Sequence, residues 1–195
     1  MTAPHRVEPG TAVFLDRDGT VIEDAHYIKS PDQVRLIPGA GEAVKRINDA
    51  NVPVIVVTNQ SGIGRGLITV DDYKAVRDHF HQLLAKHGAH IDASYFCPDH
   101  PARTGPSSCR KPATKMFEDA IHDFDLNAAN VAYVGDRWRD VVAAKKLGGR
   151  GIMISSPMTT DEDRQKAQDD GIETAPSLSA AIDMLFGLTP SGIAP

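Results

Sequence analysis

Short apolar runs alternate with longer amphipathic segments along most of the 195-residue chain. The short runs are rich in Val, Ile, Ala and Phe, which is typical of buried strands. The longer segments repeat apolar residues at spacings of three and four, as in helices that pack on a core. The predicted strands are Ala12–Leu15 and residues 52–57, 91–96, 131–134 and 151–154. The predicted helices are residues 39–50, 70–87, 115–124, the segment after Asp136 through Leu147, and Leu178–Phe186.

This alternation predicts an α/β fold with a doubly wound parallel sheet and helices on both faces, a three-layer arrangement. Residues 99–108 are rich in Pro, Gly and Ser and predict a loop. The chain has no internal repeat and no linker, so residues 1–195 are expected to form one domain with a core of about residues 11–187. The termini, including the residues after Gly187, are expected to be loose.

Composition and charge exclude several classes of function. The net charge is −5 and no basic run is present, which does not favour nucleic-acid binding. No apolar stretch reaches the roughly 18 residues of a membrane span, and the first ten residues lack the apolar region of a secretory signal. Two cysteines do not make a disulfide framework. We therefore expect a cytoplasmic protein, a monomer, that acts on a small molecule.

Polar side chains follow several predicted strands at the point where each strand ends. Asp16 and Asp18 follow the first strand, Thr58 the second, Asp136 the fourth, and Lys111 lies after the loop that follows the third. One such residue alone is more often a helix cap. Ligands of parallel α/β sheets bind where the carboxyl ends of the strands meet, so together these residues predict a site.

The residue types in this set indicate phosphoryl chemistry. The carboxylates of Asp16, Asp18 and Asp136 suit Mg²⁺, which relieves their repulsion and attracts phosphate oxygens. Asp16 can then attack phosphorus and form an aspartyl-phosphate, while Asp18 moves protons to the leaving oxygen and from water. Thr58 and Lys111 can hold the other oxygens of the transferred group.

At these residues the chain resembles the haloacid dehalogenase superfamily of phosphatases. The matching motifs are Asp16-Arg17-Asp18-Gly19-Thr20, Thr58, Lys111 and Gly135-Asp136, in this order. The resemblance implies Asp16 as the nucleophile and Asp18 as the general acid and base. It also implies Mg²⁺ held by Asp16, Asp136 and the backbone carbonyl of Asp18. No large insertion separates Thr20 from the helix at Gly39, so no separate cap domain is expected.

Four sequence blocks narrow the resemblance within the superfamily. The blocks FLDRDGT, VTNQSGIGRG, CPDHP and CRKP resemble the branch that removes the C7 phosphate of heptose 1,7-bisphosphate in nucleotide-activated heptose biosynthesis. The close alternative is the histidinol-phosphate phosphatase branch, which typically carries Asp at the position of Ser61. The substrate residues that the resemblance implies are Asp24, Ala25, His26, Tyr27, Thr58, Asn59, Gln60, Ser61, Arg110, Lys111 and Arg137.

Some of these positions also allow a structural interpretation. The planar fork of Arg110 suits a second phosphate, although an arginine on a loop can equally be a surface residue. His26 and Tyr27 can contact the sugar or simply pack their loop onto the core. Two other classes of protein also combine such features, namely the phospho-Asp receiver domains of signalling proteins and silent binding proteins of this fold. The second Asp of the D-x-D pair, able to hydrolyse the intermediate, favours an enzyme over both.

The loop after the third predicted strand departs from the family pattern. In this loop the resemblance implies the motif C-x-H followed by C-x-C, whose four side chains bind a structural zinc ion. The corresponding residues here are Cys97, Asp99, Ser107 and Cys109. Serine is a poor zinc ligand, so zinc binding is expected to be lost or weak. The alternative is a site in which Asp99 or His100 joins the two cysteines.

Overall fold

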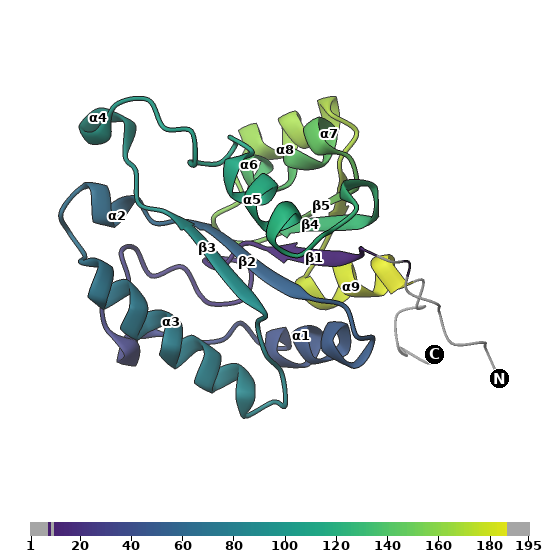
Figure 1. The fold of residues 1–195 in the computed structure, drawn as a ribbon, viewed down its shortest axis with the longest axis horizontal. Helices are drawn as coiled ribbons and strands as arrows, with labels where there is room; N and C mark the ends of the chain where they lie inside the picture. Colours follow the sequence, from purple (N-terminus) through teal and green to yellow (C-terminus); the bar gives the residue numbers. More distant parts are fainter. Residues whose placement is uncertain (1–7, 9, 187–195) are drawn as a thin grey trace.

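The computed structural model describes residue 8 and residues 10–186, which form a parallel sheet of six strands between two layers of helices (Figure 1). The strand order is β3-β2-β1-β4-β5-β6. The predicted α/β doubly wound fold is therefore confirmed. The strands are β1 (Ala12–Leu15), β2 (Val54–Asn59), β3 (Ala93–Cys97), β4 (Val131–Gly135), β5 (Arg150–Ile154) and β6 (Glu173–Ala175).

The helices divide between the two faces of the sheet (Figure 1). One face carries α1 (Ala40–Asp49), α3 (Val70–Ala85) and α9 (Leu178–Phe186). The other carries α5 (Lys115–Asp123), α6 (Trp138–Val141), α7 (Ala143–Leu147) and α8 (Asp161–Asp169). Short helices lie in the connections: η1 (Pro31–Gln33), α2 (Ser61–Gly64), α4 (Pro101–Thr104) and η2 (Ala128–Asn130).

The period of two along each strand builds a core on each face of the sheet. In β1, Val13 and Leu15 join the cluster with α1, α3 and α9, whereas Ala12 and Phe14 join the cluster with α5 and α7. The ring of Phe14 lies 5.4 Å from Phe117 and 5.3 Å from Tyr133 between ring centroids. Because β1 is buried on both faces and paired with β2 and β4, the position of the residue that follows it is tightly fixed.

The structure adds elements that the hydrophobic pattern did not predict. Helix α8 reads DEDRQKAQD and buries only Asp163 and Ala167, so it has no apolar stripe to detect. Strand β6 has three residues, two of them exposed, at the edge of the sheet. Helix α4 interrupts the predicted loop at residues 99–108. The predicted looseness of the tail falls outside the described residues. In the part of the chain that the structure describes, no helix is long and apolar enough to cross a membrane.

Candidate active site

Three carboxylates meet at the carboxyl edge of the sheet, where β1 and β4 end side by side. Asp16 follows β1 and Asp136 follows β4, as the sequence predicted. The third is Asp140, on α6, which was not predicted although it lies four residues after Asp136. Ligand oxygens of these three residues all lie within 4.8 Å of one another. The arrangement brings hard oxygen donors together in the manner of a divalent-cation site.

Lys111 lies under this cluster and is almost fully buried. Its Nζ lies 2.6 Å from Asp16 Oδ1 and 2.8 Å from Asp140 Oδ1. The same ammonium donates a 2.6 Å hydrogen bond to the carbonyl of Val57, at the end of β2. A buried ammonium with three oxygen partners is held firmly in one place. The loop containing Lys111 thus delivers a positive charge to the strand ends, as the sequence predicted.

The cluster contains more negative charge than Lys111 can balance. Burial raises the pKa of Asp16 to about 8, with the charges of Asp140 and Asp136 acting in the same direction and Lys111 opposing them. Burial and the neighbouring Asp140 also raise the pKa of Asp136, to about 6. A cation among these oxygens would relieve the repulsion that disfavours their ionised forms. The donor set therefore fits a hard divalent cation such as Mg²⁺.

Glycines allow the carboxylates to approach one another. Gly19 has a φ of +81°, and a Cβ at this position would lie 2.4 Å from Asp136 Oδ2. A Cβ on Gly135 would lie 2.5 Å from the Cβ of Asp140. Side chains at either position would push the acidic residues apart. This is the physical reason for glycine in the Asp18-Gly19 and Gly135-Asp136 pairs.

Asp18 is held in place by three side chains. The Arg17 guanidinium donates two hydrogen bonds to its carboxylate, at 3.0 and 2.9 Å. Gln60 Nε2 donates a third hydrogen bond to the Asp18 carboxylate, at 3.0 Å. It also donates a 2.9 Å bond to the hydroxyl oxygen of Thr58. Thr58 Oγ1 itself lies 3.4 Å from Asp18 Oδ2. Thr58 and Gln60 were predicted site residues, whereas Arg17 was not, because the D-x-D motif does not indicate which way the side chain between its two aspartates points.

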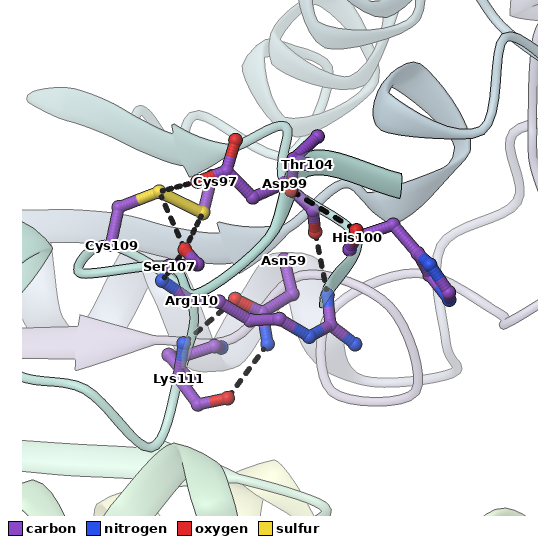
Figure 2. The surroundings of a disulfide bond; sticks show 9 residues. All are labelled: Asn59, Cys97, Asp99, His100, Thr104, Ser107, Cys109, Arg110 and Lys111. Atoms are coloured by element: carbon purple, nitrogen blue, oxygen red, sulfur yellow. Dashed lines mark hydrogen bonds between the residues drawn. A yellow bond between two sulfur atoms is a disulfide. The ribbon is translucent and has the colours of Figure 1, made fainter. Parts of the chain in front are cut away.

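Hydrogen bonds to the flanking loops complete the floor of the site. The Asn59 side chain accepts from the backbone N–H of Lys111 at 3.0 Å and donates to its carbonyl at 3.1 Å (Figure 2). Asn59, predicted to contact substrate, therefore also positions Lys111. Ser156 Oγ donates a 2.6 Å bond to Asp136, and Thr159 donates a 2.8 Å bond to the Asp136 carbonyl. Neither Ser156 nor Thr159 was predicted.

A cavity of about 210 Å³ opens above the carboxylates. Its lining includes most of the predicted substrate residues: Asp24, His26, Tyr27, Thr58, Asn59, Gln60, Ser61, Arg110 and Arg137. Two predicted substrate residues do not line the cavity. Ala25 is exposed outside the lining, and Lys111 is buried beneath the cavity floor. Arg139 and Met158 also line the cavity and were not predicted.

The loop at Asp24–Tyr27 forms one side of the cavity mouth. His26 and Tyr27 both have positive φ, 47° and 51°, and Asp24 Oδ1 accepts a 3.1 Å bond from the His26 N–H. The Tyr27 ring packs against Gly62 of α2 and lies 5.7 Å from the Arg65 guanidinium. The loop is therefore packed and also faces the cavity, and whether His26 and Tyr27 contact a sugar stays a prediction.

The other side of the mouth is the segment that precedes Lys111. Cys97 and Cys109 form a disulfide, which the sequence analysis did not predict (Figure 2). Ser107 Oγ lies 3.4 and 3.5 Å from the two sulfurs and accepts a 3.0 Å bond from the Arg110 N–H. Asp99 Oδ2 lies 3.5 Å from Cys109 Sγ. The His100 imidazole points away from the sulfurs and lies 2.7 Å from Arg65 Nη2.

Known proteins resemble the chain in sequence and in structure. The HAD-hydrolase-like family profile matches residues 108–181. The D-glycero-β-D-manno-heptose-1,7-bisphosphate 7-phosphatase of Bordetella bronchiseptica is 33% identical over 89% of this chain and 97% of that protein. The D-glycero-D-manno-heptose-1,7-bisphosphate 7-phosphatase of Thermosynechococcus vestitus is 37% identical over 76% of this chain and 80% of that protein.

Solved structures agree with the sequence comparison. The D,D-heptose 1,7-bisphosphate phosphatase from B. bronchiseptica, complexed with magnesium and phosphate, has a TM-score of 0.79 and 32% identity, with 91% of this chain and 98% of that chain covered. The corresponding enzyme from Burkholderia thailandensis has a TM-score of 0.65 and 30% identity, covering 90% of this chain and 98% of that chain.

The sheet, the strand-end acidic residues and these similarities define a HAD-like hydrolase of the phosphoric monoester class. Within that class, the chain belongs to the family of D-glycero-D-manno-heptose 1,7-bisphosphate 7-phosphatases.

Proposed function

We propose that the protein removes the C7 phosphate of D-glycero-D-manno-heptose 1,7-bisphosphate in an Mg²⁺-dependent reaction. The observation that carries this proposal is the cluster of Asp16, Asp136 and Asp140 around Lys111 at the floor of a cavity with arginines on its wall. The family relatives, and the Bordetella structure with magnesium and phosphate, support the substrate class and the metal. We further propose that the enzyme is a cytoplasmic monomer.

The residues that would hold Mg²⁺ are Asp16, Asp136 and the backbone carbonyl of Asp18, with Asp140 as a further carboxylate close by. The bound ion would neutralise the cluster and bind phosphate oxygens. Lys111 fixes the orientation of Asp16 through its 2.6 Å contact with Oδ1. A fixed carboxylate beside a bound phosphate is positioned for in-line attack.

In the proposed reaction, an Asp16 oxygen forms a bond to phosphorus while the bond between phosphorus and the C7 oxygen breaks. Asp18 donates a proton to the departing oxygen. Asp18 then takes a proton from water, which attacks phosphorus and releases inorganic phosphate and free Asp16. Thr58 donates a hydrogen bond to a phosphoryl oxygen as charge develops. The Lys111 ammonium, whose three N–H groups face Asp16, Asp140 and the Val57 carbonyl, stabilises that charge from below the cavity.

Specificity is proposed to come from the loops at the cavity mouth. Ser61 lacks the negative charge expected of the histidinol-phosphate branch, whose substrate is cationic, and thereby favours a sugar phosphate. Among the described residues, the Arg110 side chain makes one hydrogen bond, 3.3 Å from Nη1 to the Asp99 carbonyl, so donors remain for the phosphate at C1. We also propose that activity does not require zinc, because Asp99 and Ser107 stand at two of the four ligand positions of the family pattern and serine is a poor zinc ligand.

The test is the phosphate release rate with Mg²⁺ on heptose 1,7-bisphosphate, heptose 7-phosphate and histidinol phosphate. We expect the bisphosphate to give the highest kcat/KM. Arg110→Ala should lower this value about 10- to 100-fold, the loss of charged hydrogen bonds, with a much smaller effect on the monophosphate. Preference for histidinol phosphate would overturn the substrate assignment. Absence of turnover on all three, with a phosphorylated protein accumulating, would indicate a receiver-type protein instead.

A further inference from the structure

Arg139, on α6, has an unusual position for a charged side chain. It lines the cavity, and its Nε is buried without a hydrogen-bond partner. Its recorded ion pair is a loose one, 3.8 Å from Nε to Asp140 Oδ1. Within residues 10–186 no hydrogen bond from its guanidinium is found, although arginine carries five N–H donors. The structure thus presents unused, directional donors to the place where substrate would bind.

Two other arginines of the cavity, Arg17 and Arg137, donate short hydrogen bonds to carboxylates. Arg17 gives two bonds to Asp18, and Arg137 Nε gives a 2.6 Å bond to Asp163 of α8. Arg110, like Arg139, has few partners: in the part of the chain that the structure describes, its side chain bonds only to the Asp99 carbonyl. Burial and then the charge of Arg139 lower the pKa of Arg110. Two under-bonded cations that repel each other therefore line one cavity.

We propose that Arg139 acts together with Arg110 in binding the phosphate that stays on the sugar. An anion between two guanidinium groups relieves their repulsion and accepts bidentate hydrogen bonds from each. Thr58 can donate to the transferred phosphate, whereas the second phosphate has, besides Arg139, the cavity-lining arginines Arg110 and Arg137. Of these two, Arg137 is already tied to Asp163 through its Nε. The inference deepens the proposed function and rests on it, because only a substrate with two phosphates would use this pair.

The experiment compares Arg139→Ala and Arg139→Lys with the wild type on heptose 1,7-bisphosphate and heptose 7-phosphate. We expect Arg139→Ala to lower kcat/KM for the bisphosphate roughly 10- to 100-fold, mainly through KM, and for the monophosphate at most about threefold. Arg139→Lys should restore only part of the loss, because an ammonium lacks the planar fork. The matched control is Arg103→Ala, which removes an exposed positive charge outside the cavity lining and should change neither value.

A second measurement separates this inference from the proposed function. Glucose 1-phosphate, a sugar with phosphate at C1 only, should inhibit the wild type competitively and inhibit Arg139→Ala at least about tenfold more weakly. Equal losses on both substrates would overturn the inference by placing Arg139 at the transferred phosphate. Unchanged inhibition and unchanged preference would overturn it as well.

If Arg139→Ala fails to fold by circular dichroism, Arg139→Gln keeps the stem of the side chain and decides the same comparison. If the wild-type protein shows no preference for the bisphosphate, the proposed function is refuted. The inhibition assay does not depend on that preference and tests the role of Arg139 separately.

Discussion

The floor of the cavity, formed by Asp16, Lys111 and the neighbouring carboxylates, and its rim, formed by the side chains at the cavity mouth, are built in different ways. On the floor, Asp16 and Lys111 are buried at the strand ends; Lys111 Nζ has three oxygen partners, one of which is the Asp16 carboxylate. On the rim, His26 and Tyr27 are exposed, and Arg139 has no hydrogen bond within the described residues. Contacts at the strand ends thus fix Asp16 and Lys111, whereas Arg139 on α6 keeps donors that a substrate can use. Changes to the floor should abolish turnover, and changes to the rim should alter selectivity.

The largest expected effect is that of Asp16→Asn. An amide oxygen is a poor nucleophile and a neutral ligand, so kcat should fall by roughly 10⁴-fold or more. The circular dichroism spectrum should stay unchanged, because asparagine has the same shape and keeps an oxygen for Lys111 Nζ. Phosphate release is measured with Mg²⁺ on each substrate. Turnover near the wild-type level in a correctly folded variant would rule out covalent catalysis by Asp16.

Gly19→Ala is expected to reduce the rate less than Asp16→Asn does, because it displaces a carboxylate of the site without removing one. Its new methyl group would meet Asp136 Oδ2 at 2.4 Å, and a shift of about 1 Å in a catalytic group costs about 100-fold in rate. The matched control is Gly66→Ala, which has a similar positive φ of 72° but no atom within 4 Å of the added Cβ. Both variants should lose about 1–2 kcal/mol of unfolding free energy from the left-handed backbone.

Kinetic assays and chemical denaturation separate the two glycine positions. Only Gly19→Ala should lose activity and an additional increment of stability. If Gly66→Ala loses as much activity as Gly19→Ala, the backbone conformation rather than the contact with Asp136 explains the result.

The sequence predicted the floor better than the rim, for a physical reason. Asp16 and Asp136 follow buried strands, and adjacent parallel strands bring their ends together whatever the loops do. Asp140 was missed, because it lies on α6 rather than at a strand end, where the polar residues of the site were sought. The free donors of Arg139 had no signal in the sequence, because a sequence does not show which partners an arginine finds. Arg137, two residues earlier, bonds to Asp163, a residue distant in sequence. Helix α8, which supplies Asp163, was itself invisible to the hydrophobic pattern.

The smallest expected effect on turnover concerns the disulfide at the rim. Replacing Cys97 and Cys109 by serine should lower the free energy of unfolding by about 3 kcal/mol, the value for a loop of this length, relative to the oxidised wild type. The same loss should follow reduction of the wild type with dithiothreitol, while the variant should not respond. Because Asn59 holds the backbone of Lys111 from β2, kcat should change less than about threefold.

The effect of the disulfide should instead fall on substrate binding, since Arg110 directly follows Cys109 and its N–H is held by Ser107. KM for the bisphosphate should therefore rise in the variant, while KM for the monophosphate should change little. The free energy of unfolding is measured by chemical denaturation with and without reductant. Free thiols are counted by thiol titration, and bound zinc by metal analysis. Free thiols with near-stoichiometric zinc, and activity that Mg²⁺ alone cannot restore after chelation, would show that a metal rather than a disulfide fastens this loop. A loss of kcat equal to that of Asp16→Asn would show that the rim is as rigidly coupled to the chemistry as the floor, contrary to the comparison drawn from their contacts.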